Sequence, residues 1–307
     1  MNRRKAELAL LFNAVIWGTT FVLVKSALQE ISPVLFLAIR FSLATVALMV
    51  LFSAVGKWSP AGNSRVTGQS RVTGSRVTGK MLAAGSLIGV FLFAGYLLQT
   101  VGLKTTTPPK SAFLTGLATV MVPLLAALVY SIKPRISEVA GVLAATLGMG
   151  LMTLEGPVGS ISRGDLLTFG GAVAFSAHIV ATGHFAEQIG YEVLSVTQVG
   201  AAALSALSLV WWVETPRLQW QPLVVWAILI TGLLCTALAF TIQAWAQHYT
   251  TSTRTALIYA LEPVVAWITS FCIAGEGLSG RAAAGAAFIL SGVLLVEMKP
   301  SNPRKHL

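Results

Sequence analysis

The sequence predicts an all-α integral membrane protein, in which ten transmembrane helices form a 5+5 inverted repeat around a central cavity. Composition, the spacing of apolar runs and an internal repeat support this fold class. Of the 307 residues, 55% are hydrophobic and only 10% are charged, whereas about a quarter of the residues in a soluble domain are charged. The mean hydropathy of +0.77 is equally high. Such a chain is suited to a lipid bilayer rather than to water.

Ten runs of the sequence are long and apolar enough to cross a bilayer, which takes about 20 residues. They are 8–28, 33–55, 81–103, 109–130, 137–154, 166–187, 193–213, 222–246, 253–273 and 282–298. The first run follows three cations, as the apolar part of a signal peptide does. However, it is too long for a signal peptide and it contains Asn13. We therefore expect it to be the first spanning helix.

The positive charges predict the orientation of the chain. If the N-terminus is inside, fourteen Lys and Arg residues lie on the inner side, six lie on the outer side, and Arg40 lies in the membrane. Cytoplasmic loops are enriched in these residues, so we expect both termini in the cytoplasm. The net charge of +10 is carried mostly by loops and tails. This favours anionic lipid headgroups over nucleic acid as partners.

The loop 56–80 contains Ser-Arg-Val-Thr-Gly three times. It is too short and polar to pack, so we interpret it as a flexible cytoplasmic linker, with a lipid-binding arm as the alternative. Lys110 and Arg254 each follow an expected helix start, where the helix dipole disfavours a cation. We expect anionic headgroups, rather than an anionic substrate, to balance both charges.

The two halves of the chain, 1–155 and 156–307, resemble each other. A shift of 144 positions places Gln99 on Gln243, Lys110 on Arg254, Gly141 on Gly285 and Gly148 on Gly292, and a shift of 158 places Trp17 on Phe175. Each half would hold five helices, so the halves must cross the membrane in opposite directions. Inverted repeats of this kind build many secondary transporters, whose substrate site lies at the midplane between the repeats.

Several segments are similar to signatures of the drug/metabolite transporter superfamily, EamA type. They are Asn13-Ala-Val-Ile-Trp17-Gly18-Thr-Thr-Phe-Val, Arg40-Phe, Ser111-Ala-Phe-Leu-Thr115-Gly, and Ala256-Leu-Ile-Tyr-Ala-Leu-Glu262-Pro263 followed by Gly275-Glu276. The resemblance covers the chain apart from the loop 56–80. The first half departs from the pattern, because Pro123 lies one turn later than Pro263 predicts and no Glu precedes it. The resemblance implies a ten-helix exporter of metabolites or amino acids in the bacterial inner membrane.

Polar and aromatic side chains recur along one face of several predicted helices. Asn13, Trp17 and Thr20 are four and three residues apart, which places them on one helix face. Similar stripes occur at matching depths in both halves. Rings suit the apolar part of a small solute, and scattered polar groups suit its orientation. The predicted cavity-lining residues are Asn13, Trp17, Thr20, Arg40, Tyr96, Gln99, Ser111, Thr115, Phe175, His178, Gln243 and Tyr259.

These residues also have structural interpretations, which the sequence leaves open. Trp17 and Tyr259 could pack between helices, and Gln99 and Gln243 could join helices by hydrogen bonds. Arg40 could fix the bundle through a carboxylate or carbonyl, or it could meet the carboxylate of a substrate.

Two titratable groups are candidates for proton coupling. His178 lies near the middle of its predicted helix, and histidine titrates near neutral pH. Glu262 is the second candidate, although its carboxyl could instead bond to backbone that Pro263 frees. We expect a helix bend at Pro263.

The sequence therefore predicts a secondary transporter that exports small neutral or zwitterionic metabolites, such as amino acids including aromatic ones, by alternating access. The alternatives are a flippase of lipid-linked substrates, a small-drug efflux carrier and, less favoured, an intramembrane enzyme. Ser176 and His178 are too close in sequence to share a helix face, and no Gly-x-Ser-x-Gly motif occurs. No cofactor or metal motif occurs either. We expect no cofactor and no metal, a small-molecule substrate and the bilayer as partners, and a monomer as the assembly.

Overall fold

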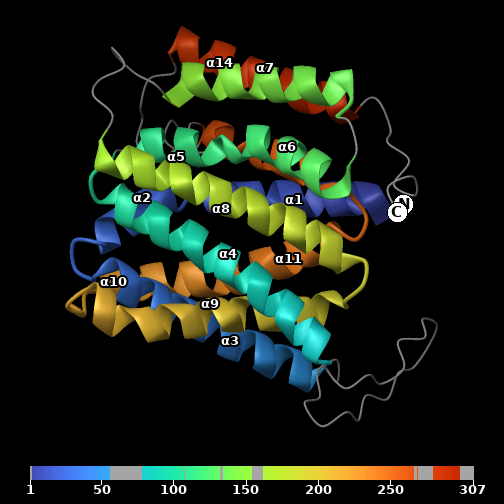
Figure 1. Ribbon diagram of the computed structural model, residues 1–307. Coiled ribbons are helices and arrows are strands. Elements are labelled where there is room, and N and C mark those ends of the chain that lie inside the picture. The colour runs from blue at the N-terminus through green and yellow to red at the C-terminus, as the bar shows by residue number, and fades with distance from the viewer. Residues whose placement is uncertain are drawn as a thin grey trace.

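The computed structural model of the chain describes residues 2–55, 78–106, 108–131, 134–153, 162–265, 268 and 279–297. Within these ranges the regular structure is helical, apart from one isolated bridge between Ile31 and Leu218. The helices lie side by side in a bundle (Figure 1). In chain order they are α1 (Asn2–Gly18), α2 (Phe21–Ala27), α3 (Pro33–Ala54), α4 (Gly79–Leu103), α5 (Pro108–Gly116), α6 (Ala118–Tyr130), α7 (Ile136–Thr153), α8 (Arg163–Ala186), α9 (Tyr191–Val213), α10 (Pro222–Leu229), the π-helix η1 (Ile230–Leu238), α11 (Ala239–Ala246), α12 (Ser252–Tyr259) and α14 (Gly280–Glu297).

The described helices agree with the predicted apolar runs. Seven described helical stretches are long and apolar enough to cross a membrane, three of which combine two or three of the helices named above. Ile136–Leu151 and Gly280–Val296 are shorter apolar helices. The run 222–246 coincides with the continuous helix formed by α10, η1 and α11. The run 253–273 is described only in its first part, and the residues 56–77 of the predicted linker lie outside the described ranges. The count of ten spans and the division at residue 155 stay predictions.

Three of the expected helices are interrupted. α1 ends at Gly18 and α2 begins at Phe21, while a single residue separates α5 from α6. α12 ends at Tyr259, and helix resumes at Glu262, just before Pro263. At the first break the backbone is closely packed, since a Cβ on Gly18 would lie 2.8 Å from the carbonyl oxygen of Glu262. The break before Pro263 is where we expected a bend, since proline cannot donate to the preceding turn.

Two helices form an outer layer of the bundle, α7 and α14 (Figure 1). Glycines allow their backbones to approach closely, as small residues do in membrane bundles. A Cβ on Gly141 would lie 2.7 Å from the carbonyl oxygen of Gly292, and one on Gly148 would lie 2.4 Å from that of Gly285. Elsewhere α4 crosses α8 and α3 packs against α9. The largest buried cluster includes Phe36, Phe41 and Phe240.

Arg254 is only 2% exposed, so the prediction that lipid headgroups balance its charge is wrong. Its Nη1 lies 3.3 Å from Glu7 Oε1, and its Nη2 donates to the carbonyl oxygen of Val296 at 2.9 Å. A buried cation needs such partners because its desolvation is costly. Arg254 therefore ties the start of α12 to α1 and α14.

Candidate substrate cavity

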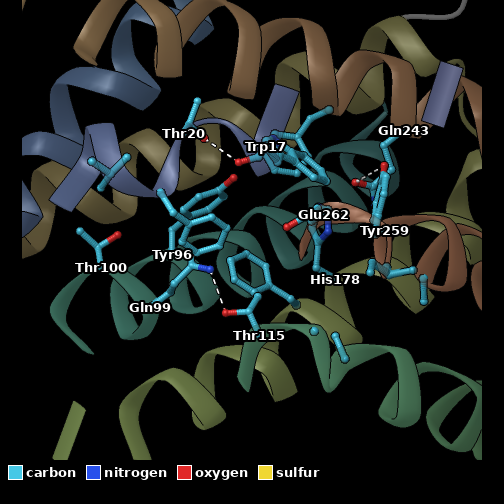
Figure 2. A pocket seen from close by; sticks show the side chains of 18 of the residues that line it. Trp17, Thr20, Tyr96, Gln99, Thr100, Thr115, His178, Gln243, Tyr259 and Glu262 are labelled. Carbon is cyan, nitrogen blue, oxygen red and sulfur yellow. Dashed lines mark hydrogen bonds between the residues drawn. The ribbon is translucent and has the colours of Figure 1, made fainter. Parts of the chain in front are cut away.

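A cavity of about 940 Å³, a volume that includes open solvent at its mouth, lies between helices of both predicted halves (Figure 2). The cavity is bordered by Trp17, Thr20, Phe21, Val24, Arg40, Tyr96, Gln99, Thr100, Leu103, Thr115, Gly116, Ala118, Thr119, Phe175, His178, Ile179, Phe240, Gln243, Ala256, Tyr259 and Glu262. Ten of the twelve residues predicted to line it are among these, as is Glu262. Substrate binding by them stays a prediction.

Asn13 and Ser111 do not border this cavity, contrary to the prediction. Both are fully buried. The Asn13 Nδ2 donates to the carbonyl oxygen of Ala239 at 2.8 Å and to the Tyr259 hydroxyl at 3.3 Å. Helix spacing placed Asn13 on the face of Trp17 correctly, but its short side chain ends behind the cavity wall. Asn13 thus supports Tyr259 instead of facing the cavity itself.

Aromatic rings form much of the wall and hold one another edge to face. The ring centroids of Trp17 and Tyr259 are 4.8 Å apart, and those of Tyr96 and Phe175 are 5.1 Å apart. Phe240 joins the two pairs, at 5.5 Å from Trp17 and 6.1 Å from Tyr96. Tilted contacts at these distances are favourable for aromatic side chains. The rings therefore form a preorganised apolar surface that spans both halves.

Equivalent positions of the two halves carry equivalent hydrogen bonds. The Gln99 Nε2 donates to the Thr115 hydroxyl at 2.9 Å, and the Tyr259 hydroxyl donates to Gln243 Oε1 at 3.4 Å (Figure 2). Gln99 corresponds to Gln243, and Thr115 to Tyr259, under the shift of 144 positions. Each half thus contributes an amide, held by a hydroxyl, to the cavity wall.

The cavity also contains two groups of opposite formal charge. Arg40 is 4% exposed; its Nε donates to the Thr236 hydroxyl at 2.8 Å, and its Cζ lies 4.3 Å from the centroid of the Tyr96 ring. Glu262 is half-buried, and Figure 2 shows its carboxyl directed into the cavity. Among the described residues Glu262 has no hydrogen bond or ion pair, and Arg40 has no carboxylate partner. Both residues border the cavity together with Tyr96.

His178 is held by a residue that the sequence analysis missed. Its Nε2 lies 2.9 Å from Gln198 Oε1, and its ring packs against Phe240 at 5.4 Å. Which ring nitrogen carries the proton decides the direction of this hydrogen bond. A glutamine within the apolar run 193–213 was the available signal for Gln198. Thr119, also missed, donates from its hydroxyl to the carbonyl oxygen of Ala256 at 3.3 Å.

A network of hydrogen bonds, here called the polar seal, separates this cavity from a second one. It consists of Gln243, Gln247, Ser252 and the carbonyl group of Ile179. The Gln243 Nε2 donates to Gln247 Oε1 at 3.0 Å. The Gln247 Nε2 in turn donates to the Ile179 carbonyl oxygen at 2.9 Å, and the Ser252 hydroxyl reaches the same oxygen at 3.3 Å.

The second cavity measures about 1,040 Å³, again including open solvent, and Gln247 and Ser252 border it. It lies among the last turns of α6 and α8 and the link from α11 to α12. This is the end of the bundle at which α1 begins (Figure 1). The first cavity extends the other way, to Val24 near the end of α2 and Leu103 at the end of α4.

A bundle of apolar helices around a polar and aromatic cavity is the architecture of a multi-pass membrane transporter. The chain belongs to the EamA-like transporter family, whose profile matches residues 4–154 and again residues 162–298. An uncharacterized transporter of Archaeoglobus fulgidus is 31% identical over 300 residues, covering 97% of this chain and 88% of that protein. The uncharacterized transporter YyaM of Bacillus subtilis is 28% identical over 306 residues, covering 96% of this chain and 94% of YyaM.

The fold is also found among solved structures. One crystal structure superposes with a TM-score of 0.74 and covers 96% of this chain and 97% of its own, at 21% sequence identity. At this level of identity the similarity concerns the fold alone. Among the described residues no group of three or more His, Cys, Asp or Glu side chains is placed to hold a metal ion.

Proposed function

We propose that this protein is a secondary transporter that exports small neutral or zwitterionic metabolites, in particular amino acids including aromatic ones. The observation that carries the proposal is the wall of the first cavity. It combines six aromatic rings, Trp17, Phe21, Tyr96, Phe175, Phe240 and Tyr259, with amide and hydroxyl groups from both predicted halves. Rings of this kind suit an apolar side chain, and the polar groups suit its hydrogen-bonding backbone.

The mechanism that we propose is alternating access. The polar seal lies between two cavities, and these extend toward opposite ends of the bundle. Opening the seal would connect the first cavity with the end where α1 begins. The rearrangement would be a rocking of the two halves about the cavity, as in other inverted-repeat carriers. The breaks after Gly18 and before Pro263 supply places at which helices can bend.

The two-halves architecture is part of this proposal. It is supported by the two separate matches of the family profile, by the paired hydrogen bonds of Gln99 and Gln243, and by the reciprocal glycine contacts between α7 and α14. We also propose the bacterial inner membrane as the location, with both termini in the cytoplasm. Cysteine mapping in intact cells should place the exposed positions Lys104, in the link that precedes Lys110, and His248, in the link that precedes Arg254, on opposite sides of the membrane. A map with both on one side would refute the inverted repeat.

A lipid-linked or other anionic substrate is the main alternative. The described lining of the first cavity includes one basic residue, Arg40. A phosphorylated headgroup is normally held by several cations. This lining therefore favours the neutral or zwitterionic class over the flippase, while a small-drug carrier of the same plan would share the aromatic wall.

Flux of labelled phenylalanine through proteoliposomes tests the proposal. We expect Trp17→Ala and Tyr259→Ala each to lower the flux about tenfold, because each removes an aromatic contact and a hydrogen bond in the wall. Trp212→Ala is the matched control, since Trp212 is 87% exposed on α9, away from the cavity. Unchanged flux in both cavity variants would show that the transport site lies elsewhere. Absence of flux for every amino acid tested would reject the substrate class.

A further inference from the structure

The proposed transport function leaves the two charged groups of the first cavity unexplained. Arg40 comes from α3 in the first half, and Glu262 follows α12 in the second half. Their side chains do not form an ion pair with each other or with another described residue. A charge without a partner in a water-poor membrane cavity is costly, and such groups mark the paths of substrates or ions.

The contacts of Arg40 orient it without neutralising it. Its Nε is held by the Thr236 hydroxyl at 2.8 Å, and its guanidinium lies 4.3 Å from the centroid of the Tyr96 ring. A hydroxyl and a ring face fix the plane of the guanidinium but bring no negative charge. The guanidinium carries a planar fork of donors that matches a carboxylate. Arg40 is therefore prepared for an anionic group that the described protein does not supply.

The carboxyl of Glu262 also lacks a partner among the described residues, and its formal charge is opposite to that of Arg40. Its carboxyl is directed into the cavity (Figure 2), which Trp17 and His178 also border. Pro263 follows it directly, but the carboxyl does not bond to the backbone that this proline frees in the described structure. Arg40 and Glu262 both border the first cavity, and the ring of Tyr96, which lies against Arg40, borders it as well.

We propose that Arg40 and Glu262 are the two poles of a site for a zwitterion. Arg40 binds the carboxylate of the ligand and Glu262 binds its ammonium group. The rings of Trp17, Tyr96 and Tyr259 border the space between the poles and contact the apolar part. This assignment rests on the proposed transport function and extends it, because it names the residues that distinguish an amino acid from an amine or a carboxylic acid of the same shape.

Three probes with one aromatic skeleton test the assignment: phenylalanine, 2-phenylethylamine and 3-phenylpropanoate. They carry both charges, only the ammonium group and only the carboxylate. Binding to the purified full-length protein is measured by titration calorimetry. We expect phenylalanine to bind about tenfold to a hundredfold more tightly than either analogue, the range for a hydrogen bond to a charged group. Equal binding of the three probes, or no binding of any, would overturn the assignment.

Two variants then assign the poles separately. In Arg40→Gln, phenylalanine should lose its advantage over 2-phenylethylamine but keep its advantage over 3-phenylpropanoate. In Glu262→Gln the pattern should be the reverse. Arg40→Lys keeps the positive charge and should retain part of the preference, and Arg217→Gln removes an exposed arginine outside the cavity as a control. Equal weakening of all three probes by either charge-removing variant would contradict the assignment.

Two measurements distinguish a lost binding site from a lost fold. The melting temperature of each variant shows whether it is folded, and the preference of the native protein among the three probes is measured without any substitution. If labelled phenylalanine is transported but the three probes bind equally, the zwitterion site is wrong and the transport function stands. If no amino acid is transported, the proposed function itself fails.

Discussion

Replacing Gln247 with leucine should open the first cavity toward the end of the bundle where α1 begins. Gln247 is 2% exposed and lies at the centre of the polar seal. The substitution removes the bond from Gln243 at 3.0 Å and the bond to the Ile179 carbonyl oxygen at 2.9 Å. It also removes a third contact, to the Ser252 hydroxyl, which is long at 3.4 Å and is not counted in the energy. Each hydrogen bond in a membrane bundle contributes about 0.6 kcal/mol, so the sealed state loses about 1.2 kcal/mol. This corresponds to an increase of about sevenfold in the unsealed population.

The population can be measured with a cysteine in the cavity. Ala118 borders the first cavity, and Ala118→Cys in a chain whose two native cysteines are replaced by alanine provides a single reactive thiol. A membrane-impermeant maleimide is added to the side of sealed vesicles on which α1 begins. We expect Gln247→Leu to raise the labelling rate about sevenfold, in proportion to the unsealed population.

The matched control for this experiment is Gln188→Leu. Gln188 also borders the second cavity, but its Nε2 donates only within its own helix region, to the carbonyl oxygen of His184 at 3.4 Å. It should leave the labelling rate unchanged. If Gln247→Leu behaves as Gln188→Leu does, the network is not the barrier between the two cavities. Faster labelling from the opposite side alone would also contradict the mechanism.

Three further predictions concern coupling and stability. If transport is coupled to protons, an imposed pH gradient should change the flux in proteoliposomes, and His178→Ala or Glu262→Gln should abolish that change; a gradient effect that survives both substitutions would place coupling elsewhere. Arg254→Met should destabilise the protein by about 3 kcal/mol in reversible denaturation, because it breaks a buried ion pair with Glu7, and the loss should be smaller when Glu7 is already replaced by Gln. Gly148→Val should lower the melting temperature through a loss of about 1–3 kcal/mol, because its side chain would meet the backbone of α14; an unchanged melting temperature would show that α7 and α14 can separate without cost.

The helices were predictable from hydropathy because a bilayer requires long apolar runs separated by polar links. The run 222–246 matches the structure at both ends. The interruption after Gly18 was not predictable in the same way. At this place Gly18 approaches the carbonyl oxygen of Glu262, which is a contact between distant parts of the sequence. Composition within one run contains no information about such a contact.

The lining of the candidate cavity was predictable in part, because residues on the same face of a helix border the same space. Spacing brought Trp17 and Thr20 to the same wall, and the internal repeat indicated Gln243. Residue spacing does not show whether a side chain reaches the surface of the cavity. For this reason Asn13 was wrongly expected in the lining. Gln247 was missed because it lies at the polar end of an apolar run, where a glutamine is expected to face water. Its burial results from the packing of α8 and α12 around it.

The π-helix η1 gives the cavity wall a property that an α-helix would lack. The carbonyl oxygen of Cys235 in this helix accepts from Trp17 Nε1 at 2.9 Å, and its Thr236 holds Arg40. Tightening this stretch by one residue to α-helical geometry would rotate everything after it by about 100° about the helix axis. Phe240 and Gln243 would then leave the wall together. A change of helical register in nine residues is thus enough to exchange the lining of one side of the cavity.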